Sequence, residues 1–161
     1  MVSILNNKQG YEFPKPIKLN KTIKDMLERE VNEEYYVDNK LDIRNNKVII
    51  SQATKKGYIE MNADGVCDLS YPNSKTRRGR VQEGGNVCPT LTATKQDIVH
   101  IDKSFRVRKL TPLECWRLMS FTDEDFYKAK EAGISNSQLY KQAGNSIVVK
   151  VLEGIFENLF M

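Results

Sequence analysis

The sequence is poor in the residues that build metal centres and disulfide frameworks. It has three cysteines, Cys67, Cys88 and Cys115, at wide and irregular spacing, and His100 is its only histidine. No Cys-x-x-Cys pair occurs. Because zinc sites and disulfide scaffolds need clustered ligands or evenly paired cysteines, we expect neither here. Unpaired thiols indicate a reducing, cytoplasmic setting.

Long apolar runs are also missing. No run approaches the length of a membrane span, and the polar N-terminal region is not a signal peptide, so we expect no membrane partner. Of the 161 residues, 40% are hydrophobic and 29% are charged, which is typical of a globular protein. This length accommodates one domain, or a small domain with an appendage.

The charge of the chain is mildly basic, at +4, and it is unevenly placed. The cations gather in two short segments: Lys75, Arg77, Arg78 and Arg80 in the first, and Lys103, Arg106, Arg108 and Lys109 in the second. Clustered cations are what the neutralisation of nucleic-acid phosphates requires. A solvated surface gives the same pattern, so charge alone leaves both interpretations open.

The first two thirds of the sequence favour short β-strands. Strand-like runs occupy residues 1–5, 47–50, 57–60, 97–101 and 105–107, with Gly, Asn, Asp and Pro between them. One helix is expected over residues 22–31, where Thr22 and Asp25 form a capping pair and the apolar residues share one face.

The last third is helical, and its start signals are clear. Thr111, Pro112 and Glu114 form a capping box with a first-turn proline, so a helix is expected to about residue 120. A second helix begins after Thr122 and stops at Gly133, and a third is capped by Ser135 and stops around residue 144.

The final helix, expected over residues 145–160, is apolar on much more than one stripe. A helix that is apolar nearly all round belongs inside a larger body. We therefore expect it to pack against material outside this sequence. A self-contained bundle of the last four helices is the alternative.

Three segments together resemble the DNA (cytosine-5)-methyltransferases. Arg108-Lys-Leu-Thr-Pro-Leu-Glu-Cys-Trp-Arg-Leu-Met-Ser-Phe121 is similar to the family's motif IX, and Gln138-Leu-Tyr-Lys-Gln-Ala-Gly-Asn-Ser-Ile-Val-Val-Lys-Val-Leu152 to its motif X. Gly85-Asn-Val-Cys-Pro-Thr-Leu-Thr-Ala-Thr94 resembles the Thr-Leu element of the target-recognition domain. The order and spacing of the three segments agree with the family. The resemblance is firm from residue 85 onward and loose before it.

Other parts of the family pattern are missing from this sequence. The family's nucleophile lies in a Pro-Cys-Gln context, whereas here only the reversed pair Cys88-Pro89 occurs. The Glu-Asn-Val motif and the glycine-rich cofactor turn are absent as well, and Gly84-Gly85 is no substitute. The resemblance therefore implies no catalytic residue in this chain, which alone is expected to be inactive. It looks like a fragment cut just before Met1, or one subunit of a split enzyme.

Two loops carry the residues that we expect to contact DNA: Lys75, Arg77, Arg78 and Arg80 in the first, and Thr90, Thr92 and Thr94 in the second. Arginine can bond guanine bidentately, and threonine can contact phosphates, base edges or the thymine methyl group. The resemblance places Arg80, Thr90 and Thr92 at the family's DNA-contacting surface. A solvated turn is the ordinary alternative for the first loop, and a half-buried strand for the second.

The segment Gly144-Asn145-Ser146 is expected to open the last helix, where free backbone N–H groups suit an anionic group such as a carboxylate. In the family this turn borders the S-adenosylmethionine site. The resemblance therefore implies that Asn145, Ser146 and Ile147 form part of a cofactor pocket. Plain helix capping would use the same residues.

Four further residues are expected to be structural. Arg108 is expected to organise the small domain, and Trp116 to be core rather than a base-stacking platform. Cys115 is expected to be a buried, inert thiol, and His100 an ordinary strand residue.

These observations predict an α+β chain with four parts. Residues 1–12 are a terminal strand and linker, 13–107 a small twisted β-rich target-recognition domain, 108–144 a helical hinge, and 145–161 a helix that would rejoin a missing Rossmann-like catalytic domain.

The resemblance implies that the chain is the DNA-recognising and cofactor-pocket-completing portion of an enzyme. That enzyme methylates C5 of a flipped cytosine in double-stranded DNA, in restriction–modification or phage protection. A stand-alone DNA-binding module and a trans-acting subunit of a split methyltransferase are the alternatives. The isolated chain is expected to dimerise through its last helix.

Overall fold

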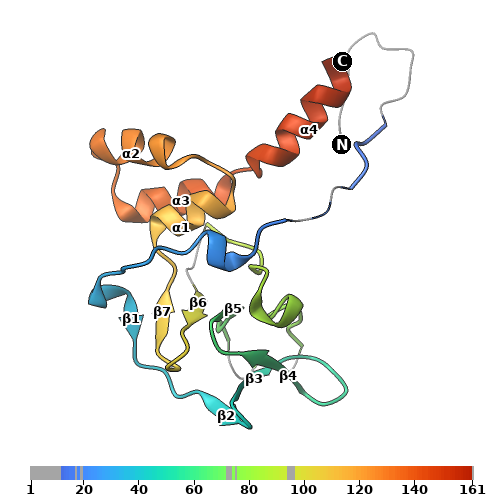
Figure 1. Cartoon of the computed structure of the whole chain (residues 1–161), viewed down its shortest axis with the longest axis vertical. Helices are drawn as coiled ribbons and strands as arrows, with labels where there is room; N and C mark the ends of the chain where they lie inside the picture. The colour runs from blue at the N-terminus through green and yellow to red at the C-terminus, as the bar shows by residue number, and fades with distance from the viewer. Residues whose placement is uncertain are drawn as a thin grey trace.

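The computed structural model describes residues 12–160, apart from residues 17, 19, 72, 73, 75 and 94–96. Two small antiparallel sheets lie beneath a layer of three helices, and a fourth helix projects to one side (Figure 1). This confirms the predicted α+β arrangement of a β-rich part followed by helices. Within the described part of the chain, no helix is long and apolar enough to cross a membrane.

The larger sheet has four strands in the order β1-β7-β6-β5: β1 (Tyr36–Val37), β7 (Val107–Lys109), β6 (Ile98–Ile101) and β5 (Gly65–Asp68). The smaller sheet joins β2 (Asp42–Arg44), β3 (Lys47–Ser51) and β4 (Tyr58–Asn62) in sequence order. A hydrophobic cluster connects the two sheets, with Val48 and Met61 contributed by the smaller sheet and Val99 and Ile101 by the larger.

The helices are α1 (Pro112–Leu118), α2 (Asp123–Glu131), α3 (Asn136–Asn145) and α4 (Val149–Phe160). Three 3-10 turns also occur: η1 (Ile23–Asp25), η2 (Glu33–Tyr35) and η3 (Glu83–Gly85). A second hydrophobic cluster joins α1, α2 and α3 to the larger sheet, through residues such as Leu113, Trp116 and Leu139 on the helices and Val66 and Ile98 on the strands. The larger sheet therefore shares one cluster with the first three helices and the other with the smaller sheet.

The predicted helix starts at Thr111, Thr122 and Ser135 are confirmed. Each of these side chains accepts a hydrogen bond from the backbone N–H three residues later. Gly133 follows the end of α2 with a φ of +83°, which is the left-handed conformation that ends helices. Local side-chain chemistry is sufficient to place these ends.

The helix predicted over residues 22–31 is wrong, because only η1 forms there. The capping pair of Thr22 and Asp25 is present. Beyond it, the backbone N–H of Glu28 donates to the carboxylate of Glu114 at 2.9 Å. This contact with a residue 86 positions away takes the place of the next helical hydrogen bond.

The predicted strands over residues 47–50, 57–60 and 97–101 correspond to β3, β4 and β6, with small shifts at their ends. The strand predicted over residues 105–107 begins later, at Val107, because Phe105 has a φ of +62° in the turn from β6 to β7. Strands β1, β2 and β5 were not predicted, because each has only two to four residues. The predicted strand over residues 1–5 lies outside the described residues.

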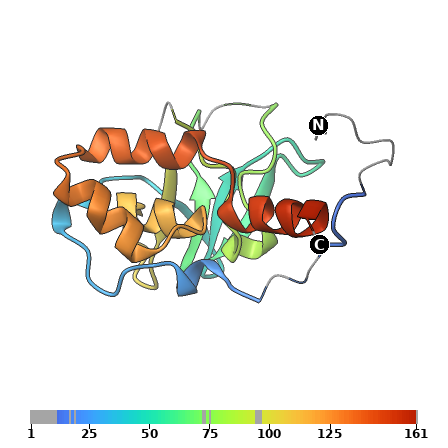
Figure 2. The ribbon, with the colours of Figure 1, turned by 90° about the horizontal axis from the view of Figure 1, so that it is seen from above.

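The last helix begins at Val149 rather than at Asn145, so its predicted start is wrong. Asn145 is the last residue of α3, and Ser146 caps it. Helix α4 then extends away from α2 and α3 (Figure 2). None of its described side chains is fully buried, and Val151, Phe156 and Phe160 stand 52%, 51% and 82% exposed. Ile147, in the turn before α4, is 59% exposed.

Candidate functional site

The Thr-Leu segment lies directly against the end of α3. A Cβ atom built on Gly144 would come within 2.4 Å of the backbone of Thr92 and Ala93. Leu91, the residue between the two described threonines, is half-buried and packs on the hydrophobic cluster beneath the helices. Two segments that are about fifty residues apart in the sequence therefore meet in van der Waals contact at a glycine.

Thr90 and Thr92, on either side of Leu91, are exposed. The segment belongs to no strand, so the alternative interpretation as a half-buried strand does not describe it. Its apolar side chain fastens it to the core while both threonines face outward. Thr94, the third threonine proposed for DNA contact, lies outside the described residues.

The basic loop places its arginines in three different environments. Arg78 is exposed. Arg77 donates to the carboxylate of Asp68 at 3.1 Å, and its guanidinium lies 5.0 Å from the centre of the Tyr71 ring. Arg77 is therefore half-buried and held in position, whereas Arg78 is the arginine whose side chain faces solvent. Lys75 lies outside the described residues.

Arg80 departs most from its predicted position. It is 1% exposed, and its guanidinium donates to the backbone carbonyls of Ser70 and Tyr71. In this conformation the guanidinium has no access to DNA, because those carbonyls and the surrounding core enclose it. A buried guanidinium that bonds two carbonyls holds the start of the loop to its end, so the contribution of Arg80 here is to fix the loop's shape.

The turn between α3 and α4 presents fewer free backbone donors than predicted. The N–H of Ser146 bonds the carbonyls of Gln142 and Ala143, and its hydroxyl donates to the Ala143 carbonyl at 2.8 Å. At the start of α4, the N–H of Val149 donates to the Met119 carbonyl at 3.0 Å. The prediction that free N–H groups of residues 144–146 open the last helix is therefore wrong. What the turn offers a ligand is the exposed side chains of Asn145 and Ile147.

A buried polar network joins β7, the start of α1 and the segment that follows η1. Arg108 on β7 forms two hydrogen bonds to the carboxylate of Glu114, at 2.7 and 2.8 Å, and the paired side chains are 4% and 0% exposed. The same carboxylate accepts from the backbone N–H groups of Thr111 and Glu28. Arg108 was predicted to organise the small domain, and Glu114 is the residue with which it pairs. The sequence signalled Glu114 only as a capping residue.

The other residues predicted to be structural are buried. Trp116 is 7% exposed and donates from its ring N–H to the Leu139 carbonyl at 2.9 Å. His100 lies in β6, where burial lowers its pKa below the ordinary value. Trp116 thus belongs to the core and His100 is a strand residue, as predicted.

The cysteine thiols are poorly suited to act as nucleophiles. Burial raises the pKa of Cys67 and of Cys88 to about 12, and it raises the pKa of Cys115 further. At neutral pH these groups stay protonated, and attack on a ring carbon requires the thiolate. Among the described residues, no group of His, Cys, Asp and Glu side chains is arranged to hold a metal ion.

Comparison with known proteins places this arrangement in a family. The family model for the C-5 cytosine-specific DNA methylase matches residues 2–161. Type II methyltransferase M2.ScrFI of Lactococcus lactis subsp. cremoris is 36% identical, over 99% of this chain and 39% of that protein. Type II methyltransferase M.HhaI of Haemophilus parahaemolyticus is 32% identical, over 95% of this chain and 44% of that protein.

A phage protein is more similar over a shorter stretch. Orphan methyltransferase M.SPBetaI of Bacillus phage SPbeta is 56% identical over 82 residues, which are 50% of this chain and 18% of that protein. The chain therefore spans less than half the length of these relatives. Because the family model covers nearly all of the sequence, the chain belongs to the C-5 cytosine-specific DNA methylase family.

Proposed function

We propose that this chain is the DNA-recognising and cofactor-pocket-completing portion of a DNA (cytosine-5)-methyltransferase. The observation that carries the proposal is the contact between the Thr-Leu segment and Gly144. It brings exposed Thr90 and Thr92 next to the turn that carries Asn145 and Ile147. A protein that recognises a DNA site and positions one base for methyl transfer needs these two surfaces to be fixed relative to each other.

In this proposal, the exposed residues of the two loops recognise DNA. Arg78 is the described arginine placed to reach a base edge or phosphate, and Thr90 and Thr92 can contact phosphates, base edges or the thymine methyl group. Arg77 and Arg80 hold the loop in shape from within. Lys75 and Thr94 remain proposed DNA contacts from the sequence pattern.

The cofactor surface involves Asn145, Ser146 and Ile147. S-adenosylmethionine supplies the methyl group in this chemistry. The amide of Asn145 can bond a polar part of such a ligand, and the exposed side chain of Ile147 can cover an apolar part. The hydroxyl of Ser146 is already bonded to Ala143, so this residue shapes the turn. These groups make one wall of a pocket, and the remaining walls must come from another body.

That body is proposed to be a Rossmann-like catalytic domain that supplies the nucleophilic thiolate. Support comes from α4, on which the apolar side chains of Val151, Phe156 and Phe160 stand more than half exposed. The start of the described chain lies along the same helix, because Asn158 donates to the Glu12 carbonyl at 2.5 Å and Gly154 lies near Pro14. A domain packed on α4 would therefore meet both ends of the described chain.

The proposed setting is restriction–modification or phage protection in the cytoplasm, where the chain without a catalytic partner is expected to be inactive. The type II and orphan names of its relatives favour that setting. A stand-alone DNA-binding module and a trans-acting subunit of a split enzyme keep the same recognition surface. The exposed apolar side chains of Val151, Phe156 and Phe160 favour an obligate partner, because an exposed patch of this kind invites association.

The test is duplex-DNA binding by the purified chain, measured by fluorescence anisotropy. The Arg78→Gln variant is expected to bind DNA roughly five- to 150-fold more weakly, because a lost arginine–guanine contact costs roughly 1–3 kcal/mol. The matched control is Lys128→Gln on α2, which removes the same charge from a residue that pairs with Glu124. Equal affinity of the Arg78→Gln variant and the unchanged chain would contradict the recognition role of this loop.

A further inference from the structure

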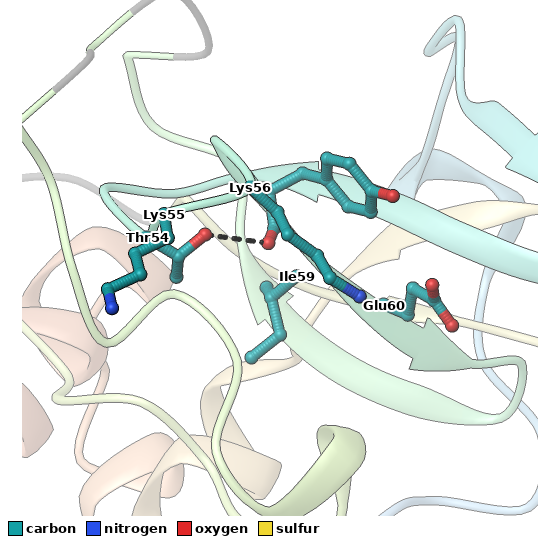
Figure 3. A pocket seen from close by; sticks show the side chains of 6 residues that line it. Thr54, Lys55, Lys56, Ile59 and Glu60 are labelled. Atoms are coloured by element: carbon teal, nitrogen blue, oxygen red, sulfur yellow. Dashed lines mark hydrogen bonds between the residues drawn. The ribbon is translucent and has the colours of Figure 1, made fainter.

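The hairpin that joins β3 to β4 ends in a closely bonded turn. The N–H of Gln52 donates to the Gly57 carbonyl at 3.1 Å, and the N–H of Gly57 donates to the Thr54 carbonyl at 3.0 Å. The hydroxyl of Thr54 bonds the carbonyl of Tyr58 at 2.9 Å, as Figure 3 shows. Gly57 has a φ of +78°, which only glycine adopts without strain. These bonds hold the tip of the hairpin in one conformation.

The tip is also fastened to the basic loop at two points. The N–H of Ala53 donates to the Arg77 carbonyl at 2.8 Å, and the N–H of Arg80 donates to the side-chain carbonyl of Gln52 at 2.9 Å. These bonds lie on either side of Arg78 in the sequence. The exposed arginine and the hairpin tip are therefore parts of one platform, although about twenty residues separate them in the chain.

Two lysines, Lys55 and Lys56, occupy the tip, and both are exposed. They line a shallow hollow of about 420 Å³ together with Thr54, Tyr58, Ile59 and Glu60 (Figure 3). None of the described residues forms an ion pair with either lysine. Such cations are free to bind a ligand.

The single carboxylate in the hollow is already bonded elsewhere. Glu60 accepts from Lys47 across the sheet at 3.0 Å, and this bond lowers the pKa of Glu60. Lys56 acts on the same carboxylate only at longer range. Because Lys47 pairs with Glu60, Lys55 and Lys56 leave the hollow with a positive charge.

We propose that the β3–β4 hairpin tip, through Lys55 and Lys56, is a second DNA-contacting surface that binds the phosphate backbone beside the recognised site. This inference rests on the proposed function and extends it from the recognition loops to the flanking duplex. Lysine binds phosphate as a point charge and carries no base preference, so the hairpin adds affinity and orientation rather than sequence specificity. A duplex long enough to extend past the recognised bases is needed to occupy it.

The test measures how the affinity of the chain for a duplex varies with salt. Each phosphate contact contributes about 0.9 to the slope of log K against log salt, so the Lys55→Gln/Lys56→Gln variant is expected to lower the slope by about two. At low salt its binding should be at least about tenfold weaker. The matched control is Lys128→Gln/Lys130→Gln, which removes the same charge on α2, on the opposite side of the molecule (Figure 1).

The outcomes distinguish a failure of the hairpin contact from a failure of the proposed function. A lowered slope in the hairpin variant, with the control unchanged, supports the hairpin contact. An unchanged slope in the hairpin variant overturns it, and the recognition role stands if Arg78→Gln still weakens binding. An equal loss in the control variant also overturns it, because the effect would then be one of net charge. If the unchanged chain binds no duplex at low salt, this result contradicts both the recognition role and the hairpin contact.

Discussion

At the scale of the residue, Gly144 is the point on which the candidate site depends. Its backbone lies so close to Thr92 and Ala93 that any added side-chain carbon would overlap them, at 2.4 Å. A contact this short with main-chain atoms cannot be relieved by rotating a flexible side chain. Glycine at this position lets the Thr-Leu segment cross the end of α3.

The substitution Gly144→Ala is expected to lower the free energy of unfolding by about 1–3 kcal/mol, because the overlap displaces the Thr-Leu segment. The matched control is Gly154→Ala on α4, where the nearest atom, Pro14 Cγ, lies at 3.8 Å. That change is expected to raise helix stability by up to about 1 kcal/mol. Thermal unfolding and amide hydrogen exchange of residues 90–93 measure both effects. Unaltered exchange protection in Gly144→Ala would show that the two segments are not held together.

At the scale of the element, the Arg108–Glu114 pair joins β7, α1 and the segment that follows η1. The pair is almost fully buried, and Glu114 also accepts from two backbone N–H groups. A buried ion pair contributes little net stability, but removing one member leaves the other charged and unpaired. The junction of these elements therefore depends on both residues.

The substitution Glu114→Gln is expected to lower the free energy of unfolding by roughly 3–5 kcal/mol, since Arg108 then lacks its buried counter-charge. Asp125→Asn provides the control, because Asp125 holds the same capping-box position on α2 but is exposed. Denaturant unfolding of the two variants compares them directly. If Glu114→Gln loses as little free energy of unfolding as Asp125→Asn, solvent must reach the Arg108–Glu114 pair.

At the scale of the whole molecule, α4 exposes large apolar side chains. Val151, Phe156 and Phe160 stand more than half exposed on a helix that packs little on the rest of the chain. Covering one such side chain contributes about 1.5–3 kcal/mol, which favours association with a partner or with a second copy. The dimerisation expected from the sequence thus remains a prediction, with these side chains as its cause.

The unchanged chain is expected to form dimers as its concentration rises, whereas Val151→Ser/Phe156→Ser should stay monomeric. Sedimentation velocity measures both, and Lys150→Ser on the same helix is the polar control. A strictly monomeric unchanged chain at high concentration would contradict the prediction. It would also remove the support that the exposed helix gives to a missing catalytic domain.

Much of the fold could be predicted because its causes are local. The helix starts at Thr111, Thr122 and Ser135 follow from hydrogen bonds that span three residues. Short strand-like runs, with Gly, Asn, Asp and Pro between them, placed β3, β4 and β6. The family could be predicted from the residues, order and spacing of the three motif segments, all of which are visible in the sequence.

The remaining features were decided by contacts between distant residues. The carboxylate of Glu114 ends the regular structure after η1, and the Met119 carbonyl receives the first N–H of α4. Arg80 is a cation in a basic loop, which predicts exposure, yet two backbone carbonyls enclose it. The sequence by itself determined the helix caps, the strand-like runs and the family. Only the tertiary structure decided which loop residues face solvent, because burial depends on partners that are far away in the chain.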